Sequence, residues 1–109
     1  MTTWLVSRHS GAVEWLAAHG YADARHVTHL ELDEIRPGDV IVGTLPVHLI
    51  AQACARGARY FNLSLDVPEA WRGRELSVAE LEACGARLEE YQVRSVNAPK
   101  PVQGIEDSP

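Results

Sequence analysis

Short apolar segments separated by polar turns run along this chain, and their spacing predicts strands and helices in alternation. Residues 3–8, 39–43 and 59–65 are apolar runs with the length of buried strands, and residues 25–30 alternate between polar and apolar side chains. Between the strands, apolar residues return at every third or fourth position, which is typical of a helix. The pattern predicts an α/β fold, with an open, mainly parallel sheet of about four strands and helices on both faces.

The predicted helices have recognisable start and stop signals. Ser10 can cap a first helix that runs to about His19, and Gly20 is placed to end that helix. A second helix is predicted over residues 45–56, with Gly57 at its end. The stripe expected to face the core consists of four residues of this helix: Val47, Ile50, Ala51 and Cys54.

A third helix is predicted to start at Ser77, because Ser77 and Glu80 have the spacing of a capping box. Its buried stripe is expected to consist of Leu81, Cys84, Leu88 and Tyr91. Gly85 lies inside this predicted helix, at a cost of roughly 1 kcal/mol relative to alanine. Residues 1–96 are expected to form one domain, and the prolines and low apolar content of residues 97–109 predict a flexible tail.

The link between the second and third predicted strands limits the order of strands in the sheet. Residues 31–38 hold at most one helical turn, whereas a parallel crossover needs about a dozen residues or more. These two strands are therefore not expected to be neighbours. The order 2-1-3-4, numbered along the chain, places the first and third strands side by side. That order also brings residues 7–9 close to residues 44–48.

Polar side chains follow the two strands that this order places next to each other. Ligands of open α/β sheets bind at the carboxyl ends of the strands, where helix N-termini favour an anion. We expect Arg8 to hold a phosphate there, and His9 or His48 to carry a proton. The other residues predicted to bind the ligand are Ser7, Ser10, Gly43, Thr44, Ser64, Arg72 and Arg74.

The three predicted catalytic residues also have plainer interpretations. His9 can be a polar loop residue that helps cap the following helix, and Arg8 can form a surface ion pair with an acidic side chain. His48 repeats with Gln52 and Arg56 at every fourth residue, opposite the apolar stripe. It can therefore be an ordinary exposed histidine.

The charge of the chain limits its ligands. A formal net charge of −5 argues against a broad basic face for duplex nucleic acid. A small anion remains compatible with this charge, because it needs only a few local cations. Residues 72–75 are either a solvated run of charges or a mobile flap that brings two arginines over a polyanion.

Other kinds of site and location are disfavoured by what the sequence lacks. His26 and His29 are expected on opposite faces of one strand, and Cys54 and Cys84 lack the spacing of metal ligands, so no metal site is predicted. No glycine-rich phosphate loop is present. The apolar runs are too short to span a membrane and no signal peptide is recognisable, so a reduced, cytoplasmic protein is expected.

Five stretches of the sequence resemble a known family. They are Thr3–Ala12 with Trp15, Pro37–Asp39, Gly43–Leu49, Arg56–Tyr60 and Arg72–Ser77. In these stretches the chain is similar to a small CRISPR-associated accessory family that accompanies type III systems. The resemblance implies a Rossmann-like, CARF-related fold and a homodimer.

The resemblance also implies an activity, that of a ring nuclease that removes cyclic oligoadenylate, with cyclic tetra-adenylate as the expected ring. RNA supplies its own 2′-hydroxyl nucleophile, so we expect cleavage without a metal or cofactor, to linear products that end in a 2′,3′-cyclic phosphate. An alternative is a module that binds or sequesters the ring without cutting it. A third interpretation is a structural accessory that binds an effector protein through its dimer face.

Overall fold

The computed structural model describes residues 1–96, which form a five-stranded sheet with helices packed against it. The strands are β1 (Thr3–Val6), β2 (Arg25–Val27), β3 (Val40–Gly43), β4 (Arg59–Ser64) and β5 (Arg87–Tyr91). The helices are α1 (Ser10–Leu16), α2 (Val47–Ala55) and α3 (Val78–Ala83), with a π-helical turn at Ala17–Tyr21 and 3₁₀ turns at Leu32–Glu34 and Glu69–Trp71. The predicted tail, residues 97–109, lies outside the described residues.

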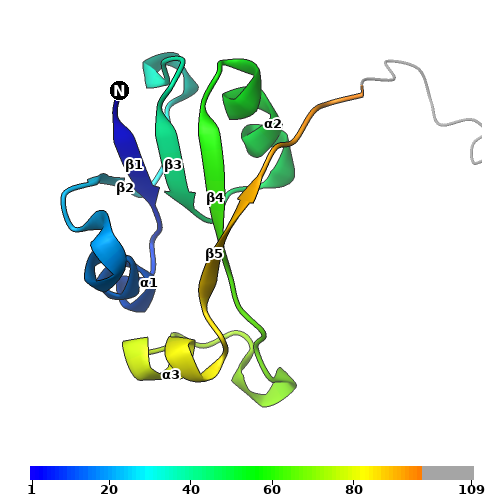
Figure 1. Cartoon of the computed structure of the whole chain (residues 1–109). Coiled ribbons are helices and arrows are strands. Elements are labelled where there is room, and N and C mark those ends of the chain that lie inside the picture. The colour runs from blue at the N-terminus through cyan, green and yellow to red at the C-terminus, as the bar shows by residue number, and fades with distance from the viewer. Residues whose placement is uncertain (97–109) are drawn as a thin grey trace, which may run out of the picture.

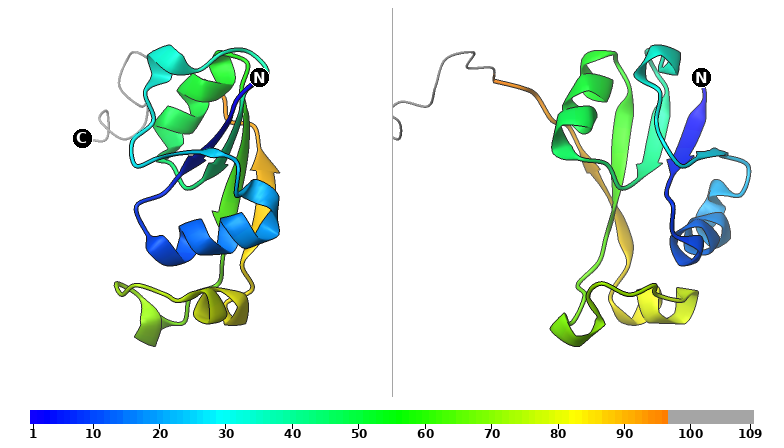
Figure 2. Two further views of the ribbon diagram at one scale, coloured as in Figure 1. Left: turned by 90° about the vertical axis from the view of Figure 1, so that its left-hand side faces the viewer. Right: turned by 180° about the vertical axis from the view of Figure 1, so that it is seen from behind.

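The strands lie in the order β2-β1-β3-β4-β5, and the first four are parallel (Figure 1). The predicted order 2-1-3-4 is therefore confirmed, and the short link over residues 31–38 does join strands that are not neighbours. Both views of Figure 2 show α3 and the segment before it beyond the carboxyl ends of β1, β3 and β4. The sequence-predicted ligand site and this segment thus lie at the same end of the sheet.

The fifth strand corrects the prediction for the third helix. α3 starts at the predicted capping box, with Ser77 accepting a hydrogen bond from the Glu80 backbone N–H, but it ends at Ala83. Gly85 has a φ of +73°, a left-handed conformation that stops a helix. The chain then reverses into β5, which pairs antiparallel with β4 and places Leu88 opposite Leu63. Leu88 and Tyr91, predicted on a helical stripe, therefore belong to a strand.

The starts of the other two helices also differ from the predictions. His9 rather than Ser10 occupies the N-cap position of α1, without a side-chain capping bond, and Ser10 is the first helical residue. In α2 the buried residues are Ile50 and Ala53, whereas Val47 is 66% exposed. α2 starts only at Val47, so this residue lies in the first turn, beside the chain that follows β5.

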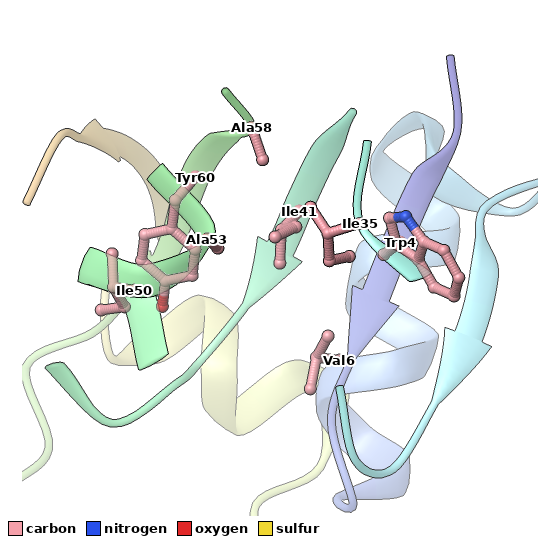
Figure 3. Close-up of a cluster of buried hydrophobic side chains, with 8 residues drawn as sticks. All are labelled: Trp4, Val6, Ile35, Ile41, Ile50, Ala53, Ala58 and Tyr60. Atoms are coloured by element: carbon pink, nitrogen blue, oxygen red, sulfur yellow. The ribbon is translucent and has the colours of Figure 1, made fainter. Parts of the chain in front are cut away.

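Two apolar clusters cover the two faces of the sheet, because successive strand residues point to opposite faces. The cluster in Figure 3 packs α2 and Ile35 against Trp4, Val6, Ile41 and Tyr60. The second cluster packs α1 and α3 against the other face, through Leu5, Trp15, Leu16, Val42, Leu63 and Leu81. The predicted helices on both faces are confirmed. Among the described residues, no helix is long and apolar enough to cross a membrane.

A buried carboxylate ties the amino ends of the two central strands together. Asp39, which is 2% exposed, accepts hydrogen bonds from the Thr2 backbone N–H at 2.9 Å and the Arg36 backbone N–H at 3.0 Å. The Trp4 indole N–H donates a third bond at 3.1 Å. Burial acts to raise the pKa of Asp39, but the bonds from Arg36, Thr2 and Trp4 outweigh it and lower that pKa below its ordinary value.

Asp39→Asn is expected to lower the free energy of unfolding by about 1–3 kcal/mol at neutral pH, because an amide NH2 leaves a buried donor without an acceptor. The lowered pKa means that the carboxylate stabilises the fold above the pKa of the unfolded chain. That stabilisation is lost as the pH falls through the folded-state pKa. Urea unfolding across acid pH measures this difference, with Asp33→Asn as control, since the Asp33 side chain is fully exposed. If the difference in unfolding free energy between the wild type and Asp39→Asn did not shrink at acid pH, this role of the Asp39 carboxylate would be wrong.

Candidate functional site

A hollow of about 620 Å³, here called the strand-end pocket, lies at the carboxyl ends of β1, β3 and β4. Most of its lining comes from residues 6–9 at the end of β1 and in the turn after it, residues 44–46 after β3, Leu63 and Leu65 at the end of β4, and residues 74–76 before α3. Ala12, Thr28 and Leu81 complete the lining. The strand order therefore brings Ser7, Arg8 and His9 close to Thr44, and the segment before α3 adds Arg74. All five are sequence-predicted site residues.

The turn after β1 is held by its own hydrogen bonds. The Ser7 side-chain oxygen accepts a bond from the His9 backbone N–H at 3.1 Å, and the Ser7 backbone N–H bonds to the Val27 carbonyl at 3.3 Å. The His26 Nε2–H contacts the Ser7 carbonyl at 2.8 Å. These bonds fix the backbone of the turn, while the side chains of Arg8 and His9 remain exposed to a ligand.

His9 is paired with a carboxylate across the pocket. Its Nδ1 lies 2.5 Å from Oε2 of Glu75, and both side chains are about two-thirds exposed. Because the contact engages Nδ1, Nε2 is the ring nitrogen that can exchange a proton with a ligand. Glu75 can hold the ring orientation and stabilise the imidazolium when it forms. The sequence places Glu75 in a run of charges 66 residues away, which gives no signal for this pairing.

Gly43 allows the turn after β3 to lie against β1. Its φ is +135°, and a Cβ at this position would lie 2.1 Å from the Val6 carbonyl oxygen. A side chain here would therefore force the two central strands apart. Gly43 is buried and does not line the strand-end pocket, so its predicted role in binding the ligand stays a prediction. What the structure shows is its close approach to β1.

A buried tyrosine fixes the same turn from the other side. The Tyr60 hydroxyl accepts a bond from the Leu45 backbone N–H at 3.1 Å and donates to the Asn62 side-chain oxygen at 2.6 Å. Asn62 in turn donates to Ser64 Oγ at 2.9 Å. Burial raises the pKa of Tyr60, against the bond from Leu45, so the hydroxyl keeps its proton at neutral pH. Ser64 does not line the strand-end pocket.

The segment before α3 reaches the pocket through a second close approach. A Cβ on Gly11, in the first turn of α1, would lie 2.0 Å from the Leu76 carbonyl oxygen. This contact brings residues 74–76 against the start of α1, and so carries Glu75 to His9 and Arg74 to the pocket. Arg74 donates to Glu80 at 2.7 Å, so it is anchored by α3.

His48 and Arg72 lie outside the strand-end pocket. His48 lines a separate hollow of about 880 Å³ between α2 and the chain after β5, together with Gln52 and Arg94. Arg72 lines a smaller hollow beside Trp71. Ser10, in the first turn of α1, is exposed but does not line the strand-end pocket. None of His48, Ser64 and Arg72 lines the pocket that holds Arg8 and His9, and Ser10 does not line it although it follows His9 in the chain. The catalytic role of His48 and the binding roles of Ser10, Ser64 and Arg72 stay predictions.

The strand-end pocket combines two arginines, a histidine paired with a carboxylate, and hydroxyls from Ser7 and Thr44. Arginine suits a phosphate, and a carboxylate-held histidine suits proton transfer beside it. In the described part of the chain, no group of three or more His, Cys, Asp or Glu residues is placed to hold a metal ion.

A family model matches most of the chain. The family described as "Putative CRISPR-associated protein (Cas_VVA1548)" matches residues 4–94, which include every segment that lines the strand-end pocket. This match confirms the resemblance to a CRISPR-associated family. No curated protein and no solved structure matches the chain.

Gly43→Ala is expected to destabilise the fold more than the same change at another left-handed glycine does. Gly73→Ala is the matched control, because Gly73 has a φ of +83° but a Cβ added there would meet nothing within 4 Å. The control should lose about 1–2 kcal/mol through backbone strain alone. Gly43→Ala should lose about 1–3 kcal/mol more, because its Cβ meets the Val6 carbonyl. Equal losses in urea unfolding would show that the close approach of β3 to β1 can relax freely.

Proposed function

The chain belongs to this CRISPR-associated family, and from that premise we propose that it is a ring nuclease of type III antiviral signalling. Its substrate is cyclic oligoadenylate, with cyclic tetra-adenylate as the ring that we expect. The observation that carries the proposal is the pairing of His9 with Glu75 next to Arg8 in the strand-end pocket. Arg8 provides a cation for a phosphate, and the paired His9 is an oriented proton carrier in the same pocket.

The proposed reaction uses the nucleophile that RNA itself contains. A ribose 2′-hydroxyl attacks the adjacent phosphorus, its proton leaves, and the bond from phosphorus to the 5′-oxygen breaks. The 5′-oxygen takes up a proton, so the ring opens to a linear product with a 2′,3′-cyclic phosphate at one end and a 5′-hydroxyl at the other. The protein has to align the 2′-oxygen with the leaving oxygen, stabilise the charge on phosphorus and transfer protons.

Residues of the strand-end pocket fit these tasks. Arg8 binds the phosphate and stabilises the additional negative charge that develops on its oxygens. His9 Nε2 accepts the 2′-hydroxyl proton, while Glu75 on Nδ1 holds the ring and stabilises the imidazolium. Thr44, which lines the same pocket, offers a hydroxyl to a second phosphate oxygen.

A homodimer is part of the proposal. A cyclic tetranucleotide has internal symmetry, and a two-fold dimer offers matched contacts to its two halves. Equilibrium sedimentation with ligand should therefore give a mass near twice the 12.0 kDa of the chain. A mass near that of one chain at micromolar concentration, with and without ligand, would contradict the dimer and leave a single pocket to bind the ring.

The direct test of the activity is to incubate the protein with radiolabelled cyclic tetra-adenylate, with and without EDTA. We expect linear products that end in a 2′,3′-cyclic phosphate, and an equal rate with EDTA because the substrate supplies the nucleophile. Ligand that is bound but remains intact would indicate a module that sequesters the messenger rather than an enzyme. Neither binding nor cleavage would favour a structural accessory.

Two kinds of variant separate binding from proton transfer. Arg8→Ala should weaken ligand binding by about 1.5–3 kcal/mol in calorimetry, the range for hydrogen bonds to a charged group. His9→Ala should slow single-turnover cleavage at least roughly tenfold while affinity changes only a few-fold. His48→Ala is the matched exposed histidine, and a rate near that of the wild type would confine the chemistry to the strand-end pocket. If His48→Ala were the slower variant, α2 rather than Glu75 would position the proton carrier.

A further inference from the structure

Trp71 is a surface tryptophan beside the strand-end pocket. It ends the 3₁₀ turn Glu69–Trp71 and is partly exposed, whereas Trp4 and Trp15 are 2% and 4% exposed. Within residues 1–96, Trp71 belongs to neither apolar cluster and is not among the side chains packed against them. The core therefore gives no reason for a large aromatic ring at this position.

An arginine side chain lies over the ring of Trp71. The guanidinium carbon of Arg74 lies 4.9 Å from the ring centroid, within the range of a cation–π contact. Arg74 also donates to Glu80 at 2.7 Å, and Glu80 accepts a bond from the Ser77 backbone N–H at 2.9 Å. The planar cation is thus anchored to the start of α3 and lies over the Trp71 ring.

A small hollow of about 340 Å³ lies against this pair and adjoins the strand-end pocket. Trp71 and Arg74 are part of its lining, and three of its residues, Leu65, Arg74 and Leu76, also line the strand-end pocket. The two hollows therefore lie side by side, with these three residues between them.

We propose that Trp71 and Arg74 form a stacking site for a nucleobase, and specifically for an adenine of the oligoadenylate whose phosphate binds at Arg8. The identity of the ligand rests on the proposed function. Bases bind tryptophan rings and guanidinium planes through their π faces, and a single-stranded RNA ring presents its bases unpaired. The pair would contribute affinity and position the ribose, whereas Arg8 and His9 would act on the phosphate.

Intrinsic fluorescence can test this site directly, because Trp71 is the partly exposed tryptophan and the other two are buried. With excitation at the red edge of indole absorption, adenosine 5′-monophosphate should quench the wild-type protein, and ribose 5-phosphate should not. Trp71→Phe should lose the quenching. Equal effects of the two probes, or unchanged quenching in Trp71→Phe, would overturn the proposal.

Affinity for an uncleavable cyclic tetra-adenylate provides the second measurement. Trp71→Ala should weaken binding by about 5- to 150-fold, the range for loss of one stacked base. Arg59→Ala is the matched control for Arg74→Ala, because Arg59 also stacks on an aromatic ring and pairs with a glutamate, but lies outside both hollows. Of these two arginine variants, only Arg74→Ala should weaken binding. Unchanged affinity in Trp71→Ala, with circular dichroism of a folded protein, would overturn the site.

The outcomes distinguish this proposal from the nuclease itself. If the wild type binds adenylate with quenching of Trp71 but never cleaves the ring, the stacking site stands and the proposed activity fails. If the wild type cleaves the ring, and Trp71→Ala binds and cleaves it as the wild type does, the activity stands and the stacking site is wrong.

Discussion

The close approach of Gly43 to the Val6 carbonyl determines where the candidate site is built. Because no side chain separates β3 from β1 at this point, the turns that follow the two strands lie side by side. A second contact of the same kind, between Gly11 and the Leu76 carbonyl, brings in the segment before α3. The strand-end pocket thus results from two places where backbone meets backbone without a side chain between them.

The two ends of the sheet have different roles. At the amino end, the buried Asp39 carboxylate accepts hydrogen bonds from the Thr2 backbone N–H and the Trp4 indole, and so holds β1 next to β3. At the carboxyl end, Arg8 and His9 remain exposed on turns whose backbones are fixed by hydrogen bonds. A rigid backbone with exposed cationic and titratable side chains is the arrangement that binding and positioning a phosphate require.

The sequence predicted the order of the four parallel strands, whereas the contacts between side chains at the candidate site became visible only in the structure. A short link over residues 31–38 was enough to separate the second and third strands, because chain length limits parallel crossovers. The helical pattern after Ser77 gave a wrong prediction for Leu88 and Tyr91. The left-handed Gly85 ends the helix, and these two residues lie in β5. The contact of His9 with Glu75 depends on how α3 is placed in space, so local periodicity carried no signal for it. His48 has the same chemistry as His9, and only the structure separates the two.

The central claim is that a phosphate of cyclic oligoadenylate binds between the turns that follow β1 and β3. A crystal structure of the protein with a cyclic tetra-adenylate whose 2′-hydroxyls are replaced by hydrogen would show where the phosphate binds. We expect a phosphate in contact with Arg8, a ribose beside His9 and the turn of residues 44–46 against the same phosphate. A ring bound in the hollow beside His48, with the strand-end pocket vacant, would contradict it.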